Sequence, residues 1–343
     1  MKPKILFISN KRSLPYTDQK NQKHTSILAS GLSNSIKFVV DMLENEGYDC
    51  KYVQVIDGNC IDKVVTLEKP SIVIIEAIWV TPKKLEELSK LHKKIKWIVR
   101  IHSEIPFLAN EGVAIDWLIQ YSKINNHIFI SANSDRAQKE LQVIVNKDVF
   151  YLPNYYPVDV LDFNKKIVGQ HIDIGCFGAI RPMKNQLLQA VAAIKFADDI
   201  NKKLRFHINI NREETGGNSV LKNIRSLFES CDGELIEHPW ADHHEFIKII
   251  SKIDIGMQAS FSETFNIVTA DMVNKYIPVV VSNDIRWVRD EFKVEPTSFN
   301  ELVSKLNYCY KNINSRIVKK NKEALADYSK KSVCNWKKFL KEI

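Results

Sequence analysis

Long hydrophobic runs are missing from this sequence. None of its apolar stretches approaches the ~20 residues that a membrane-spanning helix requires. The first residues, 1–9, place lysines ahead of a short strand-like run, without the longer apolar core and small-residue cleavage site of a signal peptide. The sequence therefore predicts neither a spanning helix nor a signal peptide.

Other functional patterns are missing too. The six cysteines are scattered between Cys50 and Cys334 without a Cys-x-x-Cys pair, so neither a zinc site nor a disulfide framework is expected, and a reducing cytoplasm suits them. No Gly-x-Ser-x-Gly, P-loop or Gly-x-Gly-x-x-Gly sequence is present, which argues against hydrolase, kinase and dehydrogenase functions. Repeats and low-complexity segments are absent as well.

The composition is typical of a globular protein, and its charge is unevenly placed. With 45% hydrophobic and 26% charged residues, a chain of 343 residues predicts two domains of ordinary size. The net charge is +8, and residues 313–343 carry nine Lys or Arg against three acids, 9 − 3 = +6. Such a segment attracts polyanions, either nucleic acid or an anionic membrane, unless it serves only solubility.

Short apolar runs alternate with helical patterns in the first half of the chain. Strands are expected at Ile5–Ser9, Lys51–Val55, Ile72–Ile75, Trp97–Ile101, Ile128–Ser131 and Val149–Leu152. Helices are expected at Asn34–Glu46, Lys83–His92, Ile115–Lys123 and Arg136–Val145. The continuous β-branched runs indicate a parallel sheet covered on both faces, and the alternation predicts a doubly wound α/β domain.

A break with two prolines follows at residues 152–157, and the pattern then restarts. Strands are expected at Ile172–Phe177, Leu204–Ile210, Leu235–Ile236, Ile253–Ala259 and Val279–Ser282. Helices are expected at Gln186–Ala197, Val220–Glu229, His243–Ser251, Asn266–Asn274, Glu301–Asn312, Ser315–Tyr328 and Lys331–Lys341. We predict one α/β domain over 1–155, a second over 156–312 and basic helices over 313–343. A cleft between the carboxyl ends of the two sheets would bind ligands.

The stretch 261–284 is the most informative about function. It reads as a loop with an acidic residue, Glu263, then a helix, then a buried strand. Asp271 lies a little over two helical turns further on, so residues near it face roughly the side of the helix start. The residues expected to expose donors for a phosphate at that start are Thr264, Phe265, Asn266 and Ile267. One side of one helix could thus hold a sugar hydroxyl, a diphosphate and a ribose.

A second segment, 175–186, opens the second half with a strand, a glycine turn and two cations. Gly178 lets the backbone pass close to a ligand. Arg181 and Lys184 follow the strand end, where they can neutralise a leaving diphosphate. Together with the acidic loop about eighty residues later, they indicate a nucleotide-sugar site.

These two segments resemble the donor-site motifs of GT-B glycosyltransferases of the family-4 (retaining, group 1) type. In this chain, Asp271 takes the place of the family's second Glu, which is one methylene longer. The resemblance covers nearly the whole chain, is strongest over 172–290, and implies two Rossmann-like domains facing a central cleft. Arg181, Lys184 and the amides at 265–267 would hold the diphosphate, Glu263 the sugar hydroxyls and Asp271 the ribose.

The resemblance extends to residues outside the two motifs. Gly31, after Ser30, resembles the glycine-rich start of the first helix, and His102, after a strand, resembles the family's strand-end histidine that reaches toward the donor sugar. His238 and Trp240 follow a second-domain strand where the family binds the base. Apart from the resemblance, Arg212 follows the strand Leu204–Ile210, and from that position it would add to the phosphate site.

The resemblance also implies the reaction. A sugar would move from a nucleoside-diphosphate sugar, most simply a UDP-sugar, with retention of configuration, and the acceptor proton would pass to a departing phosphate oxygen. No Asp-x-Asp is present, so no metal is expected, because the cations and the helix start take its place.

The acceptor stays open at this point. The sequence has the character of phage-type DNA-modifying glycosyltransferases, and the basic tail could follow a DNA backbone toward a hydroxymethylated base. Alternatively, the lysine-rich segment 83–94 could rest on an anionic membrane beside a glycan or lipid-linked acceptor. A catalytically silent nucleotide-sugar-binding protein is the remaining alternative. We favour the DNA base, because no apolar surface insertion is evident.

Overall fold

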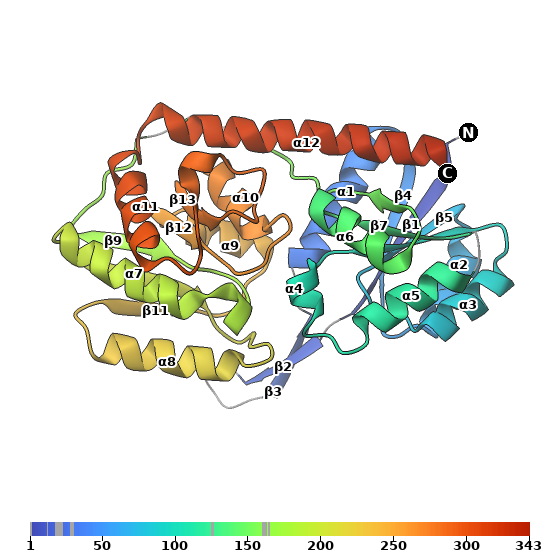
Figure 1. Cartoon of the computed structure of the whole chain (residues 1–343), viewed down its shortest axis with the longest axis horizontal. Coiled ribbons are helices and arrows are strands. Elements are labelled where there is room, and N and C mark those ends of the chain that lie inside the picture. The colour runs from blue at the N-terminus through green and yellow to red at the C-terminus, as the bar shows by residue number, and fades with distance from the viewer. Residues whose placement is uncertain are drawn as a thin grey trace. The chain divides into compact units, whose positions relative to one another are not determined.

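The computed structural model describes residues 2–11, 13–17, 23–27, 31–124, 127–159, 163 and 165–343. The chain divides into two compact units. Unit 1 contains residues 1–157 and 329–343, and unit 2 contains residues 158–328. Figure 1 labels most of the helices and strands of both units.

Unit 1 contains a six-stranded parallel sheet in the order β4-β1-β5-β6-β7-β8. Its strands are β1 (Lys4–Asn10), β4 (Asp49–Val55), β5 (Ile72–Glu76), β6 (Lys96–Ile101), β7 (Ile128–Ala132) and β8 (Val149–Tyr151). All five residues of β5 are buried, as expected for a central strand covered on both faces. The six strands predicted for this half of the chain are therefore confirmed, with ends that differ by one or two residues.

Helices cover both faces of this sheet. They are α1 (Gly31–Asn45), α2 (Cys60–Glu68), α3 (Pro82–Leu91), α4 (Ile105–Leu108), α5 (Ala114–Ile124) and α6 (Asp135–Val145). Alternate β1 side chains enter different cores. Leu6 and Ile8 pack with α2, α3, α5 and α6, while Ile5 and Phe7 pack with α1. Sequence reasoning did not include α2, α4 or the antiparallel pair β2 (Ser13–Thr17) and β3 (Lys23–Ile27).

Unit 2 contains a second six-stranded parallel sheet, in the order β11-β10-β9-β12-β13-β14. The strands are β9 (His171–Gly175), β10 (Lys203–Asn209), β11 (Glu234–His238), β12 (Ile255–Gln258), β13 (Val279–Ser282) and β14 (Lys293–Val294). The helices are α7 (Gln186–Asp199), α8 (Gly217–Glu229), α9 (His243–Ile250), α10 (Ile267–Asn274) and α11 (Phe299–Lys311), with 3-10 turns η1 (Pro182–Lys184) and η2 (Asp290–Phe292). This strand order is that of a dinucleotide-binding fold, so ligands are expected at the carboxyl ends of the strands.

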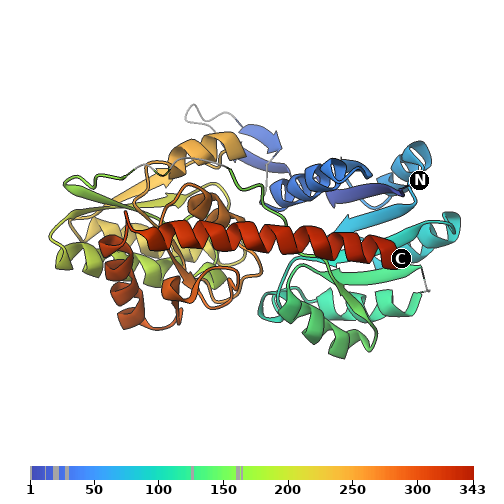
Figure 2. The ribbon, with the colours of Figure 1, turned by 90° about the horizontal axis from the view of Figure 1, so that it is seen from above.

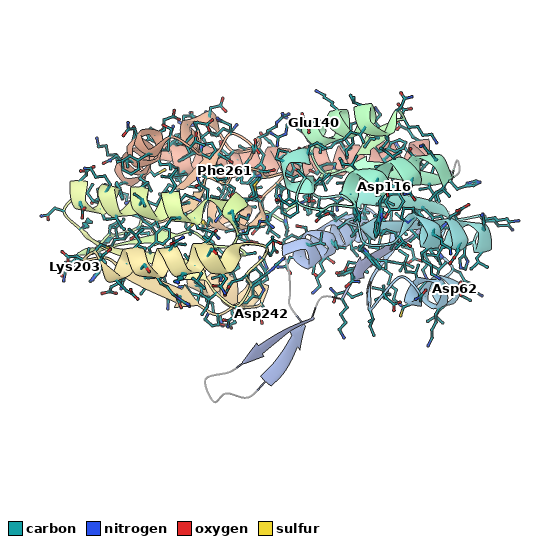
Figure 3. The ribbon with its side chains drawn as sticks, turned by 60° about the horizontal axis from the view of Figure 1, so that its bottom comes forward. Asp62, Asp116, Glu140, Lys203, Asp242 and Phe261 are labelled. Atoms are coloured by element: carbon teal, nitrogen blue, oxygen red, sulfur yellow. The ribbon has the colours of Figure 1, made fainter. Side chains whose placement is uncertain are left out.

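Local capping explains where several helices begin. The Thr81 hydroxyl accepts from the Lys84 N–H at 3.2 Å before α3, and Ser134 accepts from the Ala137 N–H at 3.0 Å before α6. The Asp242 carboxylate, labelled in Figure 3, accepts from the Glu245 N–H at 2.9 Å and fixes the start of α9.

The C-terminal segment forms one helix, α12 (Arg316–Glu342), of 27 residues. The prediction of two helices here was wrong, because no glycine or proline interrupts the helical pattern near Ser329. Figure 2 shows α12 as an uninterrupted helix. Its residues up to 328 belong to unit 2 and the rest to unit 1, where the Trp336 Nε1 donates to the Pro153 carbonyl at 2.9 Å. Among the described residues, no helix has the length and hydropathy to cross a bilayer.

Candidate functional site

The glycine turn after β9 is the first part of the candidate site in unit 2. Gly178 has a φ of +123°, a conformation that side chains with a Cβ rarely adopt. Its N–H donates to the Asn209 Oδ1, at the end of β10, at 3.1 Å. The turn is therefore fixed to the neighbouring strand, with its backbone available for a close approach by a ligand.

The predicted cations lie beside this turn and already contact carboxylates. Arg181 Nη1 and Arg212 Nη2 both donate to the Glu214 carboxylate, the second at 2.9 Å. Burial raises the pKa of Glu214, but the two guanidinium groups outweigh burial and hold that pKa below its usual range. The Arg212 guanidinium also lies 4.8 Å from the Trp240 ring centroid. Glu214 thus bridges two groups that sequence reasoning assigned to phosphate binding.

Lys184 contacts the acidic residue that the sequence singled out. Its ammonium donates to the Glu263 Oε1, and the two side chains are only 13% and 10% exposed. The Glu263 N–H donates to the Asp284 Oδ2 at 3.2 Å. Two segments about eighty residues apart in the chain therefore meet at one place in unit 2. Three cations, Arg181, Lys184 and Arg212, thus stand there against three carboxylates, Glu214, Glu263 and Asp284.

The start of α10 differs by one residue from the prediction. The helix begins at Ile267, and Asn266 is its N-cap with φ +57°; its side chain accepts from the Thr269 N–H at 2.9 Å. Thr264 and Phe265 therefore lie in the loop before the cap, and the Phe265 ring is buried against Tyr328. The amides without an intrahelical acceptor are those of Asn266, Ile267 and Val268.

A buried amide joins the glycine turn to this helix start. Gln258, at the end of β12, donates to the Phe177 carbonyl at 2.8 Å and accepts from the Asn266 Nδ2 at 2.9 Å. Gln258 is 2% exposed, and both polar atoms of its side chain have hydrogen-bond partners inside the protein. Sequence reasoning missed this residue, although a glutamine ending an apolar strand is a detectable signal.

The predicted ribose ligand, Asp271, is 1% exposed. Its Oδ1 lies 2.8 Å from the His243 Nε2 at the start of α9. This hydrogen bond is the main reason that the pKa of His243 is raised. The His243 side chain is 29% exposed, so the more accessible member of this pair is the histidine.

The predicted base ligands stand at the end of β11. His238 Nε2 lies 2.9 Å from the His207 Nδ1, and the His207 Nε2 lies 2.8 Å from the Asp173 Oδ1. Burial, followed by the neighbouring His207, lowers the pKa of His238 to about 4, so this ring is neutral at neutral pH. Trp240 is half-buried. His207 on β10 thus positions the His238 ring, and Asp173 on β9 positions His207.

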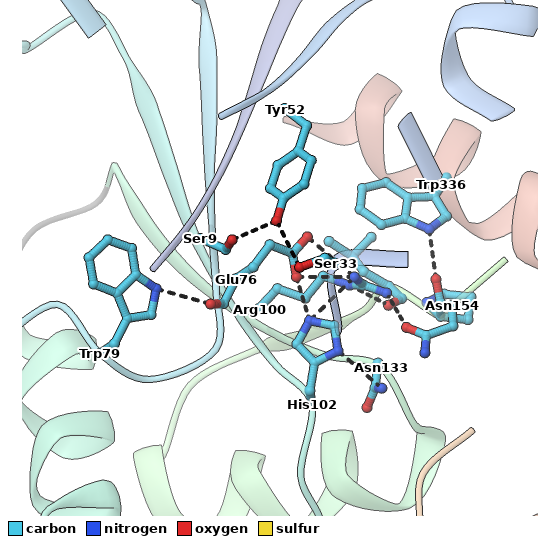
Figure 4. Close-up of polar contacts among 12 residues, drawn as sticks. Ser9, Ser33, Tyr52, Glu76, Trp79, Arg100, His102, Asn133, Asn154 and Trp336 are labelled. Carbon is cyan, nitrogen blue, oxygen red and sulfur yellow. Dashed lines mark hydrogen bonds and ion pairs between the residues drawn. The ribbon is translucent and has the colours of Figure 1, made fainter. Parts of the chain in front are cut away.

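In unit 1, His102 is part of a buried polar cluster at the carboxyl ends of β5 and β6 (Figure 4). Its Nε2 contacts the Glu76 Oε2, and its Nδ1 lies 3.4 Å from the Asn133 Nδ2. Arg100 Nη1 lies 3.2 Å from the same Glu76 oxygen. Burial, followed by the Arg100 charge, lowers the pKa of His102. His102 is thus held as a neutral ring beside a buried carboxylate.

Arg100 connects this cluster to the segment that follows β8. It is fully buried, and its guanidinium donates to the Leu152 carbonyl at 2.9 Å and to the Asn154 Oδ1 at 2.7 Å.

Gly31 is the first residue of α1, while Ser30 before it lies outside the described residues. Among the residues that the structure describes, no group of three His, Cys, Asp or Glu side chains is arranged to hold a metal ion.

Comparison with known proteins identifies the fold. No protein-family model and no curated protein matches the sequence. A solved glycosyltransferase from Rickettsia africae is 14% identical with a TM-score of 0.66, over 99% of this chain and 98% of that one. Anabaena HepE in complex with UDP and glucose is 14% identical with a TM-score of 0.69, over 99% and 100%. Thermosynechococcus elongatus sucrose-phosphate synthase is 10% identical with a TM-score of 0.70, over 99% and 98%.

Staphylococcus aureus TarM, solved with UDP, is also similar. It is 14% identical with a TM-score of 0.60 over 78% of this chain, which spans about 55% of the length of TarM. Together these likenesses confirm the predicted fold class, the α/β architecture of GT-B glycosyltransferases with two Rossmann-like units.

Proposed function

We propose that this protein is a glycosyltransferase that moves a sugar from a nucleoside-diphosphate sugar, most simply a UDP-sugar, to a hydroxyl acceptor. The observation that carries this proposal is the meeting of Arg181, Lys184 and Glu263 beside the glycine turn of unit 2. UDP is present in the HepE and TarM structures, which supports the choice of nucleotide. The basic and acidic groups required to bind both parts of such a donor are thus in one place.

The diphosphate would replace carboxylates that the cations now contact. Arg181 and Arg212 share Glu214, and Lys184 pairs with Glu263. A diphosphate carries more charge than one carboxylate and offers more acceptor oxygens, so it competes for the same donors. Released from Lys184, Glu263 would accept hydrogen bonds from the sugar hydroxyls, while the amides of Asn266 and Ile267 would complete the phosphate site.

The proposed chemistry needs no separate base. The bond between the anomeric carbon and the phosphate oxygen breaks, and a bond to the acceptor oxygen forms on the same face, which retains the configuration. The acceptor proton passes to the departing phosphate oxygen. Arg181 and Lys184 stabilise the charge that develops on the leaving diphosphate, the function a metal ion serves in other transferases. His102 would contact the donor sugar as a neutral ring.

The nucleoside would lie along β11 and α10. The Asp271 carboxylate is buried, so it would not contact the ribose itself. His243, which Asp271 holds by a hydrogen bond, would contact the ribose in its place. His238 and the half-buried Trp240 would contact the base, with the Trp240 ring as a stacking surface.

For the acceptor, we propose a hydroxymethylated base in DNA. Its support is the basic helix α12, where seven of the nine cations counted in the sequence are exposed. Of the two that are not exposed, Lys322 donates to the Asn274 carbonyl at 2.8 Å, and Lys337 donates to the Glu46 carboxylate at 2.6 Å. A glycan or lipid-linked acceptor at an anionic membrane is the second candidate, favoured by the lysines at and after α3.

A transfer screen tests this proposal. Nucleotide sugars would be offered with hydroxymethylated DNA, glycans and lipid-linked sugars, and the products read by mass spectrometry and by the proton coupling constant at the anomeric carbon. We expect UDP release that depends on an acceptor, with the anomeric configuration retained. Binding of UDP without transfer to any acceptor would favour a catalytically silent protein, and inversion would exclude the retaining mechanism.

A further inference from the structure

A cavity of about 320 Å³ lies in unit 1, among residues that follow the carboxyl ends of β4 and β5. It is lined by Gly58, Asn59, Trp79, Val80, Thr81, Lys83, Lys84 and Glu87, and is called the Trp79 pocket below. Its residues come from two segments, one following β4 and the other following β5 and continuing into α3. The volume is at the lower end of the range for small-molecule sites, and suits one sugar or nucleotide unit.

The position of the pocket in the sheet is one where ligands bind. β4 and β5 are the two neighbours of β1, and the chain reverses its direction along the sheet between them. Open parallel sheets bind ligands outside the carboxyl ends of their strands, near such a reversal. The Trp79 pocket is formed by the segments that leave those carboxyl ends.

The charges in the pocket favour an anion. Lys83 is exposed and has no ion-pair partner among the described residues. Lys84 is half-buried and lies 3.3 Å from the Glu87 carboxylate. The first turn of α3 contains no acid, so two cations stand at the helix end where the dipole disfavours them. With Lys83 and Lys84 against Glu87 the balance is 2 − 1 = +1, and a bound anion would relieve the repulsion.

The aromatic wall of the pocket is connected to His102. The Trp79 Nε1 donates to the Glu76 carbonyl at 3.0 Å, and the Glu76 carboxylate contacts the His102 ring. Figure 4 shows Glu76 between Trp79 and His102. Trp79 is partly exposed, so its ring is available to stack on a sugar or base. Glu76 therefore links the wall of the pocket to the histidine that sequence reasoning placed in the reaction.

We propose that the Trp79 pocket binds the acceptor through a phosphate ester, with the phosphate at Lys83 and Lys84 and the adjoining ring on Trp79. This inference deepens the proposed function, and rests on it, because it states which chemistry the acceptor must carry. A phosphorylated sugar and a nucleotide unit of DNA share that chemistry. A neutral glycan lacks it.

The test uses the protein without any nucleotide sugar. The indole N–H signal of Trp79, identified by its loss in Trp79→Phe, would be followed by NMR while two pairs of probes are added. One pair is 5-hydroxymethyl-deoxycytidine with and without its phosphate, and the other is glucose with and without a phosphate. We expect the phosphorylated member of at least one pair to shift this signal and to bind at least about tenfold more tightly than its partner, the effect of one charge-assisted contact.

A matched pair of variants assigns the effect to the pocket. Lys83→Met with Lys84→Met should remove the preference for the phosphorylated probe. Lys93→Met with Lys94→Met removes the same charge from exposed positions just beyond α3 and should leave the preference unchanged. Thermal unfolding of both variants checks that they fold.

Three results would overturn the inference: no phosphorylated probe shifts the Trp79 signal, each pair of probes binds equally, or both double variants lose the preference alike. The two pairs of probes separate a nucleotide source from a sugar source. Because no donor is present, failure here leaves UDP binding by unit 2 untouched, and failure of UDP binding leaves this result standing.

Discussion

At the residue scale, the candidate donor site is a set of charges already paired within unit 2. Two arginines share Glu214 and one lysine holds Glu263, with side chains between 10% and 26% exposed. Partial burial strengthens such pairs and makes an unpaired member costly. In the account above, these carboxylates keep the cations ordered until a diphosphate displaces them.

Replacing Glu263 with Gln should separate sugar chemistry from nucleotide binding. We expect transfer to fall about 10²–10³-fold, the size of effect found when one preorganised polar group is lost from an active site. UDP affinity should not fall, since Lys184 is released from its partner. Steady-state kinetics and UDP calorimetry check this. Glu245→Gln, an exposed glutamate of α9, serves as control, and unchanged turnover in Glu263→Gln would remove the assignment.

The His243–Asp271 pair should make stability depend on pH. The pKa of His243 is raised above its usual 6.5, first by the hydrogen bond to Asp271 and further by the charges of Asp271, Asp242 and Asp159. Its contribution is therefore complete below pH 6.5 and is lost as pH rises through the folded-state pKa. The wild type should melt at a higher temperature than His243→Gln, and this difference should be larger at about pH 5.5 than at about pH 9. A difference that grows with pH would contradict this sign.

At the element scale, strand positions followed from the sequence because buried parallel strands read as continuous β-branched runs. The predicted strand at Val279–Ser282 has the observed bounds. The start of α10 was placed one residue too early, because a side-chain cap at Asn266 and its positive φ are invisible to periodicity. Likewise β14 has two residues, too few for a hydrophobic pattern.

For the site, the sequence indicated the contact partners Lys184 and Glu263 through two separate motifs. It did not indicate Glu214, Gln258 or His243, because their importance lies in partners brought close only by the fold. Asp271 was predicted to hold the ribose, and only the structure shows that its carboxylate is buried.

Gln258→Leu tests the connection between β12 and α10. The change leaves the Phe177 carbonyl and the Asn266 amide without their partner, which should cost about 1–3 kcal/mol of folding stability for each buried group left unsatisfied. UDP affinity should fall as well, because the helix start loses its connection to the glycine turn. Urea denaturation and UDP calorimetry measure the two effects.

Gln138→Leu is the control for Gln258→Leu. The Gln138 Nε2 donates to the Val149 carbonyl at 2.8 Å in unit 1. The Gln138→Leu change should lower folding stability and leave UDP affinity unchanged. Equal loss of UDP affinity in the two variants, or none in Gln258→Leu, would show that Gln258 does not position the site.

At the scale of the whole molecule, the chain combines two sheets of different strand order with one helix, α12, that contributes to both units. Most of the cations that make residues 313–343 basic are exposed on the surface of that helix. Sequence reasoning reached the fold class because each half repeats the same alternation of elements. It could not reach the acceptor, because acceptor recognition depends on side chains gathered from several segments.

If DNA is the acceptor, its binding should be steeply salt-dependent. Each phosphate contact releases counterions, so affinity for a hydroxymethylated oligonucleotide should fall about 10³-fold or more between about 50 and 200 mM salt for six or more contacts. Fluorescence anisotropy measures this. A neutral glycan is the matched comparison, and its binding should hardly change. A flat salt response for the oligonucleotide would remove DNA as the acceptor.

Arg181 and Lys184 are proposed to bind the diphosphate of a nucleotide. Calorimetric titration of UDP into wild type, Arg181→Met with Lys184→Met, and the control Lys195→Met with Lys222→Met tests it directly. We predict that wild type and control bind alike and that the first double variant loses at least ~100-fold in affinity, since hydrogen bonds to charged groups contribute about 1.5–3 kcal/mol each. Equal UDP affinity in all three proteins, or no UDP binding by wild type, would contradict the account.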